Sequence, residues 1–293
     1  MKLITTNELL TALLPNVAVS VEGESPLIDK LTPFLNNAEE WVAVTFLSSA
    51  IFADICTLED TDTLRSTTTQ VVVYEAFRRA LPHLDIVLTP NGFGIVSNNT
   101  IAPASKERIE RLMGTLINNR DAAIAQLLNT VSQQSDWLST SQAEFFRATM
   151  FPNITLAERF PRSSSSFGGS GDGDLWEQYL SLRLSLIPIE EYFATQYISK
   201  ELLEVLHSEV QSGSYRSTLH QQICRILQAV EVRCLKSSEP TSAMYFEHGQ
   251  LSDIVNTIRN NPEDFPEWHS SPTAELYTPP VFENKKSSNG FWF

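Results

Sequence analysis

The stretch EEWVAVTFLS at residues 39–48 recurs as EEYFATQYIS at residues 190–199, which sets an offset of 151 positions. The same offset, without a gap, pairs the tripeptide RST at residues 65–67 with RST at residues 216–218. Two matches that share one offset are hard to explain by chance, and they predict that the chain contains an internal repeat.

A third match lies further along the chain in the same order. TLINN at residues 115–119 resembles TIRNN at residues 257–261, at an offset of 142 positions. The second copy therefore has nine residues fewer, in the part that follows the second match. These three matches indicate a degenerate tandem duplication.

Apolar residues recur every three or four positions through both copies, which is the period of an amphipathic helix. The first helix should bury a group of large side chains, namely Trp41, Phe46, Ile51, Phe52 and Ile55. The expected helices span residues 27–55, 68–81 and 103–131 in the first copy and residues 175–187, 199–210, 215–235 and 250–260 in the second. The second helix should stop near Pro82, and Pro188 should break or kink the chain that follows it. Asp174 followed by Glu177 is typical of a capping box at a helix start.

Residues 84–97, LDIVLTPNGFGIVS, interrupt the helical pattern of the first copy. Two short runs rich in Ile, Val, Leu and Phe flank the turn Pro90-Asn91-Gly92, in which proline fixes φ and the next two residues accept positive φ. The pattern predicts a β-hairpin on an otherwise helical scaffold. A two-stranded hairpin is marginally stable alone, so it must lie on helices or pair with another chain.

The fold class that we expect is mainly α, a degenerate tandem duplication of a helical unit with one β-hairpin arm in the first unit. The expected segments are an N-terminal segment at residues 1–26, a first helical unit at 27–133 with the hairpin at 84–97, a connecting region with a Ser/Gly-rich loop at 134–174, a second helical unit at 175–261, and an extended Pro-rich tail at 262–293.

The tail ends in three aromatic residues. They can pack back on their own chain, or they can insert into a neighbouring subunit, because aromatic side chains bury a large area at a low entropic cost. The second predicted strand offers an unpaired edge that another chain could use. The candidate interface residues are therefore Phe93, Ile95, Val96, Phe291, Trp292 and Phe293.

Composition and charge narrow the classes of function. The 293 residues are 42% hydrophobic and carry a formal net charge of −14. This excess of negative charge argues against direct binding to nucleic-acid phosphates or to an anionic membrane. The N-terminus is a poor signal peptide and no run approaches 18 apolar residues, so we expect a protein of the cytoplasm or of a particle assembled there. Three scattered cysteines indicate free thiols rather than a disulfide framework.

No catalytic motif stands out in the sequence. The five histidines show no metal-ligand spacing, and Gly92-Phe93-Gly94 lacks the third glycine of a dinucleotide-binding loop. The paired acids at residues 39–40 and 190–191 point about 100° apart on a helix, so we expect a solvated face or ion pairs with Arg65 and Arg216. We therefore expect no catalytic, cofactor or metal site, and a protein that is not an enzyme.

Residues 84–112, LDIVLTPNGFGIVSNNTIAPASKERIERL, resemble the signature stretch of an uncharacterised structural family encoded in tailed phages and prophages of gut bacteria. The similarity extends over most of residues 27–131. The helix–helix–hairpin–helix layout is also similar to head–tail connector (neck adaptor) proteins, small helical subunits that form rings beneath the portal and reach a neighbour with an extended arm. This chain departs from them in being about twice as long and duplicated, and in its aromatic-ended tail.

The resemblance implies a virion structural protein, a head–tail connector or neck ring subunit that joins the portal to tail components. It implies a homo-oligomeric ring with the portal protein and other neck or tail proteins as partners, in the neck region of the virion and in the host cytoplasm during assembly. It implies no specific nucleic-acid binding, no membrane and no cofactor. The alternatives are a monomeric cytosolic binding module and an enzyme with an unrecognised site.

Overall fold

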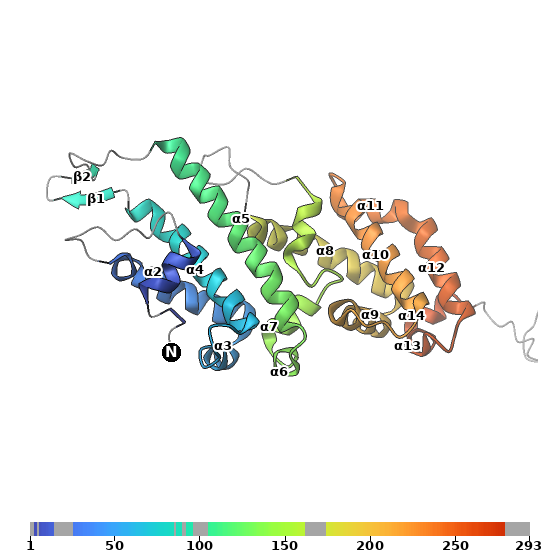
Figure 1. The fold of residues 1–293 in the computed structure, drawn as a ribbon. Coiled ribbons are helices and arrows are strands. Elements are labelled where there is room, and N and C mark those ends of the chain that lie inside the picture. Colours follow the sequence, from blue (N-terminus) through green and yellow to red (C-terminus); the bar gives the residue numbers. More distant parts are fainter. Residues whose placement is uncertain are drawn as a thin grey trace, which may run out of the picture. The chain divides into compact units, whose positions relative to one another are not determined.

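Helices make up most of the chain in the computed structural model, which describes residues 3–4, 6–14, 26–84, 86–89, 92–95, 105–161 and 174–278 (Figure 1). The mainly helical fold class is thus confirmed. The chain forms two compact units. Unit 1 comprises Met1–Ile187 with His207–Ser214, and unit 2 comprises Pro188–Leu206 with Tyr215–Phe293.

Unit 1 is built around the long helix α4 (Thr63–Leu84), which packs against both α2 (Leu27–Val42) and α5 (Lys106–Val131). Its core includes Val72, Ala76 and Phe77, each at most 1% exposed. The smaller elements of unit 1 are α1 (Asn7–Leu13), the π-helical turn η1 (Ala43–Leu47), α3 (Ser49–Ile55), α6 (Ser135–Leu138), α7 (Ser141–Arg147) and the 3-10 turn η2 (Ile154–Arg159).

Two short strands lie between α4 and α5 in the sequence. The strands β1 (Ile86–Thr89) and β2 (Gly92–Ile95) pair antiparallel, with Ile86 opposite Ile95 and Thr89 opposite Gly92. Figure 1 shows them beyond the C-terminal end of α4. The two residues that join the strands lie outside the described chain.

The helix α8 (Leu175–Phe193) begins in unit 1 and continues into unit 2. It runs through Pro188, so a break at this proline is wrong, whereas α4 ends at Leu84, close to Pro82 as expected. The helix α8 continues through Pro188 because of packing, since Leu186 and Ile189, on either side of the proline, are both fully buried. Burial of the flanking face outweighs the cost of about 3 kcal/mol that a helical proline carries.

Unit 2 repeats the arrangement of a π-helical turn between helices. After α8 it contains the π-helical turn η3 (Ala194–Ile198), the first part of α9 (Lys200–Ser212), α10 (Thr218–Lys236), α11 (Pro240–Ala243), the 3-10 turn η4 (Met244–Glu247), α12 (His248–Asn260), α13 (Pro266–His269) and α14 (Pro272–Glu275). Its core includes Leu206, Leu227 and Ile258, all fully buried.

The structure differs from the expected extended tail over residues 262–278. This segment forms α13 and α14, and Phe265 and Trp268 are buried there. The connecting region at residues 134–174 likewise contains folded elements, with Trp137 and Phe146 buried. In both places large aromatic side chains find a partner surface in the same unit, which local composition does not reveal. The remaining tail, residues 279–293, lies outside the described residues.

Candidate functional site

The structure places the expected interface residues only in part. Phe93 and Ile95 lie on β2, whose backbone is described, while their side chains are not. Val96 and the aromatic end Phe291-Trp292-Phe293 lie outside the described residues. The features that the structure does define are two sharp π-helical corners, an aromatic cluster and a buried network of charges.

The first corner breaks the helix that the sequence predicts over residues 27–55. The chain leaves α2 through the π-helical turn η1 and reaches Ser48, which has a φ of 85°. A side chain at positive φ is strained by about 1–3 kcal/mol. The Ser48 hydroxyl accepts a hydrogen bond from the N–H of Ile51 at 3.4 Å, so it caps α3 and offsets part of this strain.

The second corner has the same construction. The turn η3 is followed by Ser199, with a φ of 64°, and the Ser199 hydroxyl accepts from the N–H of Leu202 at 3.2 Å. Among the described residues, Ser48 and Ser199 are the non-glycine residues with positive φ. They stand 151 positions apart, at the offset of the sequence match.

A tryptophan fastens the first corner. The indole N–H of Trp137 on α6 donates to the carbonyl of Phe46 at 2.7 Å, and the amide of Gln142 on α7 donates to the carbonyl of Val44 at 2.9 Å. A π-helical turn shifts the regular hydrogen-bond register, so its carbonyls need partners from outside the helix. Trp137 and Gln142 supply them, and the corner is held from the side.

A tryptophan fastens the second corner in the same way. The indole N–H of Trp268 on α13 donates to the carbonyl of Tyr197 at 2.6 Å, and the hydroxyl of Thr273 donates to the carbonyl of Ala194 at 3.1 Å. Sequence reasoning missed both tryptophans. The signal is present: WLSTSQAE at residues 137–144 aligns with WHSSPTAE at residues 268–275, at an offset of 131.

An aromatic cluster surrounds the first corner. Phe46, Phe52 and Ile55 are buried as expected, whereas Trp41 and Ile51 are only half-buried. Trp41 lies edge-on to Phe46 with 5.1 Å between ring centroids, and the guanidinium of Arg79 lies 5.5 Å from its ring. The cation lies at the distance of a favourable cation–π contact with this half-buried ring.

The first two turns of α8 close this cluster within unit 1. The ring of Trp176 lies 5.0 Å from Phe46 and 6.2 Å from Phe146, and that of Tyr179 lies 6.3 Å from Phe146. One turn further on, the guanidinium of Arg183 lies 3.8 Å from the ring of Phe145. Residues 176, 179 and 183 share one helix face, so α8 covers the aromatic cluster with a single stripe.

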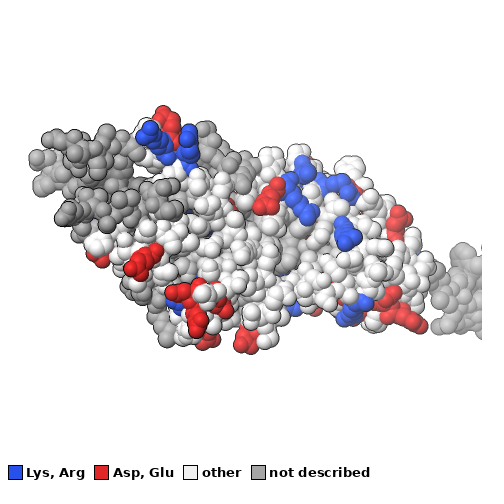
Figure 2. Space-filling model, in the orientation of Figure 1, with Lys and Arg blue, Asp and Glu red and all other residues white. Residues whose placement is uncertain are grey.

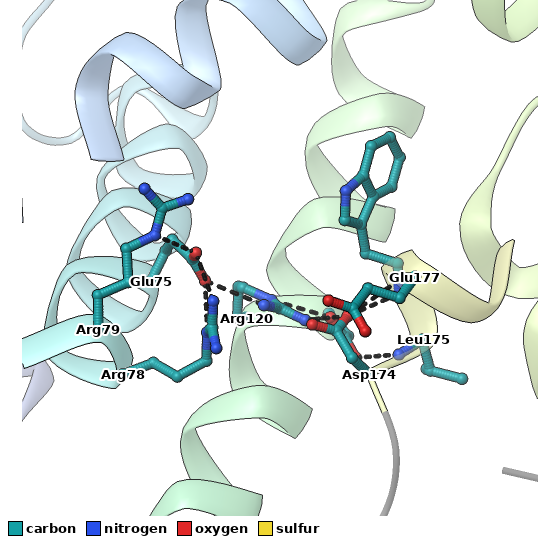
Figure 3. A network of polar contacts seen from close by, with 9 residues as sticks. Glu75, Arg78, Arg79, Arg120, Asp174, Leu175 and Glu177 are labelled. Atoms are coloured by element: carbon teal, nitrogen blue, oxygen red, sulfur yellow. Dashed lines mark hydrogen bonds and ion pairs between the residues drawn. The ribbon is translucent and has the colours of Figure 1, made fainter. Parts of the chain in front are cut away.

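A network of charges joins three helices in the interior of unit 1 (Figure 3). Arg120 on α5 is 1% exposed, and its guanidinium donates to Glu75 on α4 at 2.9 Å. It also donates to Asp121 at 2.6 Å and to Asp174, just before α8, at 2.5 Å. Figure 3 shows the Arg120 guanidinium between Glu75 and Asp174. The arginine therefore fixes α4, α5 and the start of α8 to one another.

The acids of this network are satisfied from several sides. Arg78 and Arg79 also donate to Glu75, at 2.8 Å and 2.5 Å. Burial by itself would raise the pKa of Glu75, but the hydrogen bonds from Arg78 and the charge of Arg120 lower it to about 2. Asp174 accepts from the N–H groups of Trp176 and Glu177, which confirms the expected helix cap. These carboxylates are occupied by guanidinium and backbone protons, so the network orients helices.

The paired acids do not form a solvated face. Glu39 is 8% exposed and accepts the N–H of Leu3 at 2.8 Å, and Glu190 is 3% exposed. The expectation of a solvated face is therefore wrong for the first glutamate of each pair, because both positions point into a unit's core. Arg65 pairs with Asp60 at 2.9 Å and Arg216 with Glu267 at 2.5 Å.

Unit 2 also buries an acid without a hydrogen-bond donor. Glu231 on α10 is fully buried, and neither of its carboxylate oxygens has a hydrogen-bond partner. Burial raises its pKa well above the ordinary value of 4.5, and the nearby Glu190 raises it further. The protonated form of Glu231 is therefore the one that the folded unit favours.

Over the ranges that the structure describes, no three or more His, Cys, Asp and Glu side chains are arranged to hold a metal ion. None of the described helices is both long enough and apolar enough to cross a membrane.

The match found among known proteins lies within unit 1. Residues 21–147 match the model of a family of unknown function (DUF6712). The match runs from the segment before α2 to the end of α7, so it includes the first π-helical corner, Trp137 and the pair formed by Glu75 and Arg120. Searches of curated proteins and of solved structures found no match. Over these residues the chain is similar to that family.

Proposed function

We propose that the chain is a virion structural protein, a head–tail connector (neck) ring subunit that joins the portal to tail components of a tailed phage. The observation that carries this proposal is the antiparallel strand pair β1–β2, set between the long helices α4 and α5 of an otherwise helical unit. The resemblance of residues 84–112 to a tailed-phage family supports the same function.

The strand pair has backbone groups to offer a partner. In the described chain the sheet consists of β1 and β2, so each strand is paired along one edge. A two-stranded ribbon is marginally stable by itself and gains from a third strand or a covering surface. Strand addition by a neighbouring subunit satisfies both requirements, and it is a common way to join protein chains.

The arm lies between two helices that are fixed to each other. α4 ends at Leu84 and α5 begins at Lys106, and the two helices pack against each other. The buried ion pair between Glu75 and Arg120 joins them. Helices that are fixed to each other on both sides of an arm lower the entropy that its docking would cost, which suits a segment used for assembly.

We further propose that the two sequence copies, at residues 27–133 and 175–261, arose by tandem duplication. At the offset of 151 both copies have a buried glutamate, a π-helical turn of five residues and a capping serine with positive φ, in the same order. Trp41 and Tyr192, at the same offset, are each half-buried, and they lie edge-on to Phe46 and Tyr197, which also stand at this offset. A ring built from such chains would present two related helical modules for every subunit.

The charge of the chain also supports a place around a DNA channel. The net charge of −14 gives phosphates little to bind, so DNA could pass without being held. Figure 2 shows acidic and basic side chains in small separate groups over the face that is drawn, with no continuous basic surface on the coloured part.

The test replaces Phe93 and Ile95 together by Asp in the full chain and measures the oligomeric state of the purified protein and its incorporation into particles. We expect the wild-type chain to form a ring and the variant to remain a folded monomer that is not incorporated. Val44→Asp is the matched control, because Val44 is an apolar residue of unit 1 that is 61% exposed. Unchanged assembly of the Phe93 and Ile95 variant would contradict the proposed role of the arm.

A further inference from the structure

The aromatic cluster at the second corner is exposed to solvent on the side where α8 covers the cluster at the first corner. Leu276 and Tyr277 stand at the positions of Phe145 and Phe146, at the offset of the two tryptophans. In unit 1, Phe146 is fully buried because Trp176 and Tyr179 of α8 pack against it. In unit 2, Leu276 is 64% exposed and Tyr277 is half-buried.

We name this open surface the aromatic face of unit 2. Its residues are Tyr192, Tyr245, Leu276 and Tyr277. Tyr192 contacts Tyr245, which is 62% exposed, with 5.4 Å between ring centroids. The hydroxyl of Tyr277 donates to the carbonyl of Gln196 in η3 at 2.7 Å, and the ring of Tyr192 lies 5.8 Å from that of Tyr197 in the same turn, so Tyr277 and Tyr192 both lie against η3. Exposed aromatic surface of this kind marks an interaction site.

Unit 1 shows what kind of group covers such a face. The stripe on α8 brings a tryptophan, a tyrosine and then a cation, with the guanidinium of Arg183 stacked on Phe145. The covering segment lies downstream of the aromatic residues that it covers, since Trp176 follows Phe146 by 30 positions. The occupant that fits the aromatic face of unit 2 is therefore a downstream segment with aromatic side chains and nearby positive charge.

The C-terminal residues of the chain have this chemistry. Phe291-Trp292-Phe293 supplies the rings, and Lys285-Lys286 supplies positive charge that complements the exposed Glu275 beside Leu276. The 13 positions from Thr278 to Phe291 can span at most about 45 Å.

We propose that Phe291-Trp292-Phe293 of one copy docks on the aromatic face of unit 2 of a neighbouring copy. This inference rests on the proposed homo-oligomeric ring, and it names the surface that receives the tail. Exchange of an identical segment between copies is an economical way to join subunits, because one pair of surfaces serves every interface of a ring.

The test is cysteine cross-linking in the full chain. Cys56, which is half-buried, is first replaced by Ala, while Cys224 and Cys234 are buried. A copy with Leu276→Cys is mixed with a copy with Trp292→Cys, assembled and oxidised, and a disulfide-linked dimer is expected. The matched control is Leu184→Cys in place of Leu276→Cys, because Leu184 is an apolar residue of unit 1 that is 73% exposed, and it should give no dimer.

A second measurement does not depend on disulfide chemistry. Leu276→Asp should weaken self-association about 30-fold, the loss typical of an interface hot spot, and Leu184→Asp should weaken it less than about 3-fold. A chain with both Leu276→Cys and Trp292→Cys that cross-links within itself would show that the tail covers its own copy, and it would overturn the proposal. So would equal effects of the two aspartate substitutions.

The outcomes also separate this inference from the proposed function. An oligomeric wild-type chain that gives no cross-link between copies would overturn the docking of the tail and leave the ring in place. A wild-type chain that is monomeric at every concentration would overturn the ring and the docking of the tail together.

Discussion

Replacing Arg120 by Met should destabilise unit 1 by about 3–5 kcal/mol. The change removes the hydrogen bonds to Glu75, Asp121 and Asp174 and leaves buried carboxylates without their central cation. Glu75 keeps Arg78 and Arg79, and the other carboxylate oxygen of Asp121 keeps the N–H of Leu175 at 3.0 Å. The loss is therefore expected within this range, against a total stability of about 5–15 kcal/mol for a typical domain.

Urea unfolding of the full chain measures this effect, with tryptophan fluorescence as the signal. Three tryptophans, Trp41, Trp137 and Trp176, report on unit 1. With a slope of about 2 kcal/mol per molar urea, the midpoint of the unit 1 transition should fall by about 2 M.

The matched control is Lys106→Met, in the same unit. Lys106 pairs with Glu110 at 3.5 Å, but its side chain is 79% exposed, so this pair should contribute at most about 1 kcal/mol. If Arg120→Met shifts the midpoint no more than Lys106→Met does, the reasoning that the buried network fastens α4, α5 and α8 is refuted.

Further predictions concern the buried acids and the two corners. The pKa of Glu75 is about 2 in the folded state, below its ordinary 4.5. Its contribution of about 3 kcal/mol to the free energy of unfolding is therefore complete above pH 4.5 and is lost as the pH falls toward 2. Unfolding measured over this pH range should show the loss, and Glu75→Gln should remove this pH dependence. The pKa of Glu231 is raised in the folded state, so its contribution to stability is highest below pH 4.5 and falls as the pH rises through the folded pKa. Glu231→Gln should remove this contribution between pH 4.5 and 8. An unchanged dependence of stability on pH would contradict the view that Glu231 causes it. Trp137→Phe and Trp268→Phe each leave a corner carbonyl without its donor and should each cost about 1–3 kcal/mol in thermal unfolding, whereas an effect at one corner alone would speak against a shared construction.

The helical class and the start of α8 could be predicted because both depend on local patterns. Any helix with one buried face has an apolar residue at every third or fourth position. Asp174 caps α8 by accepting from the N–H groups of residues only two and three positions later. The corner at Ser48 could not be found in this way. A π-helical turn inserts one residue into a continuous pattern, and the apolar period hardly changes on either side.

The buried network of charges could not be predicted from the sequence for a different reason. Glu75 and Arg120 are 45 positions apart, and Arg120 and Asp174 are 54 apart, so only the packing of the helices brings them together. A buried charged residue almost always has an ion-pair partner, but the sequence alone does not show which residue that partner is. The hydrogen bonds from the two tryptophans to the corners could not be predicted for the same reason, since Trp137 lies 91 positions from Phe46 along the sequence.

The proposed function is tested most directly by locating this chain in tailed-phage particles produced by cells that carry its gene. An antibody against the exposed part of unit 2, or a tag fused to the chain, can be located on purified particles by electron microscopy. A connector predicts a ring of label at the neck, between the head and the tail, and cross-links from the chain to the portal protein. Particles that lack the chain, or that carry it on the head surface or at the tail tip, would contradict the proposed function.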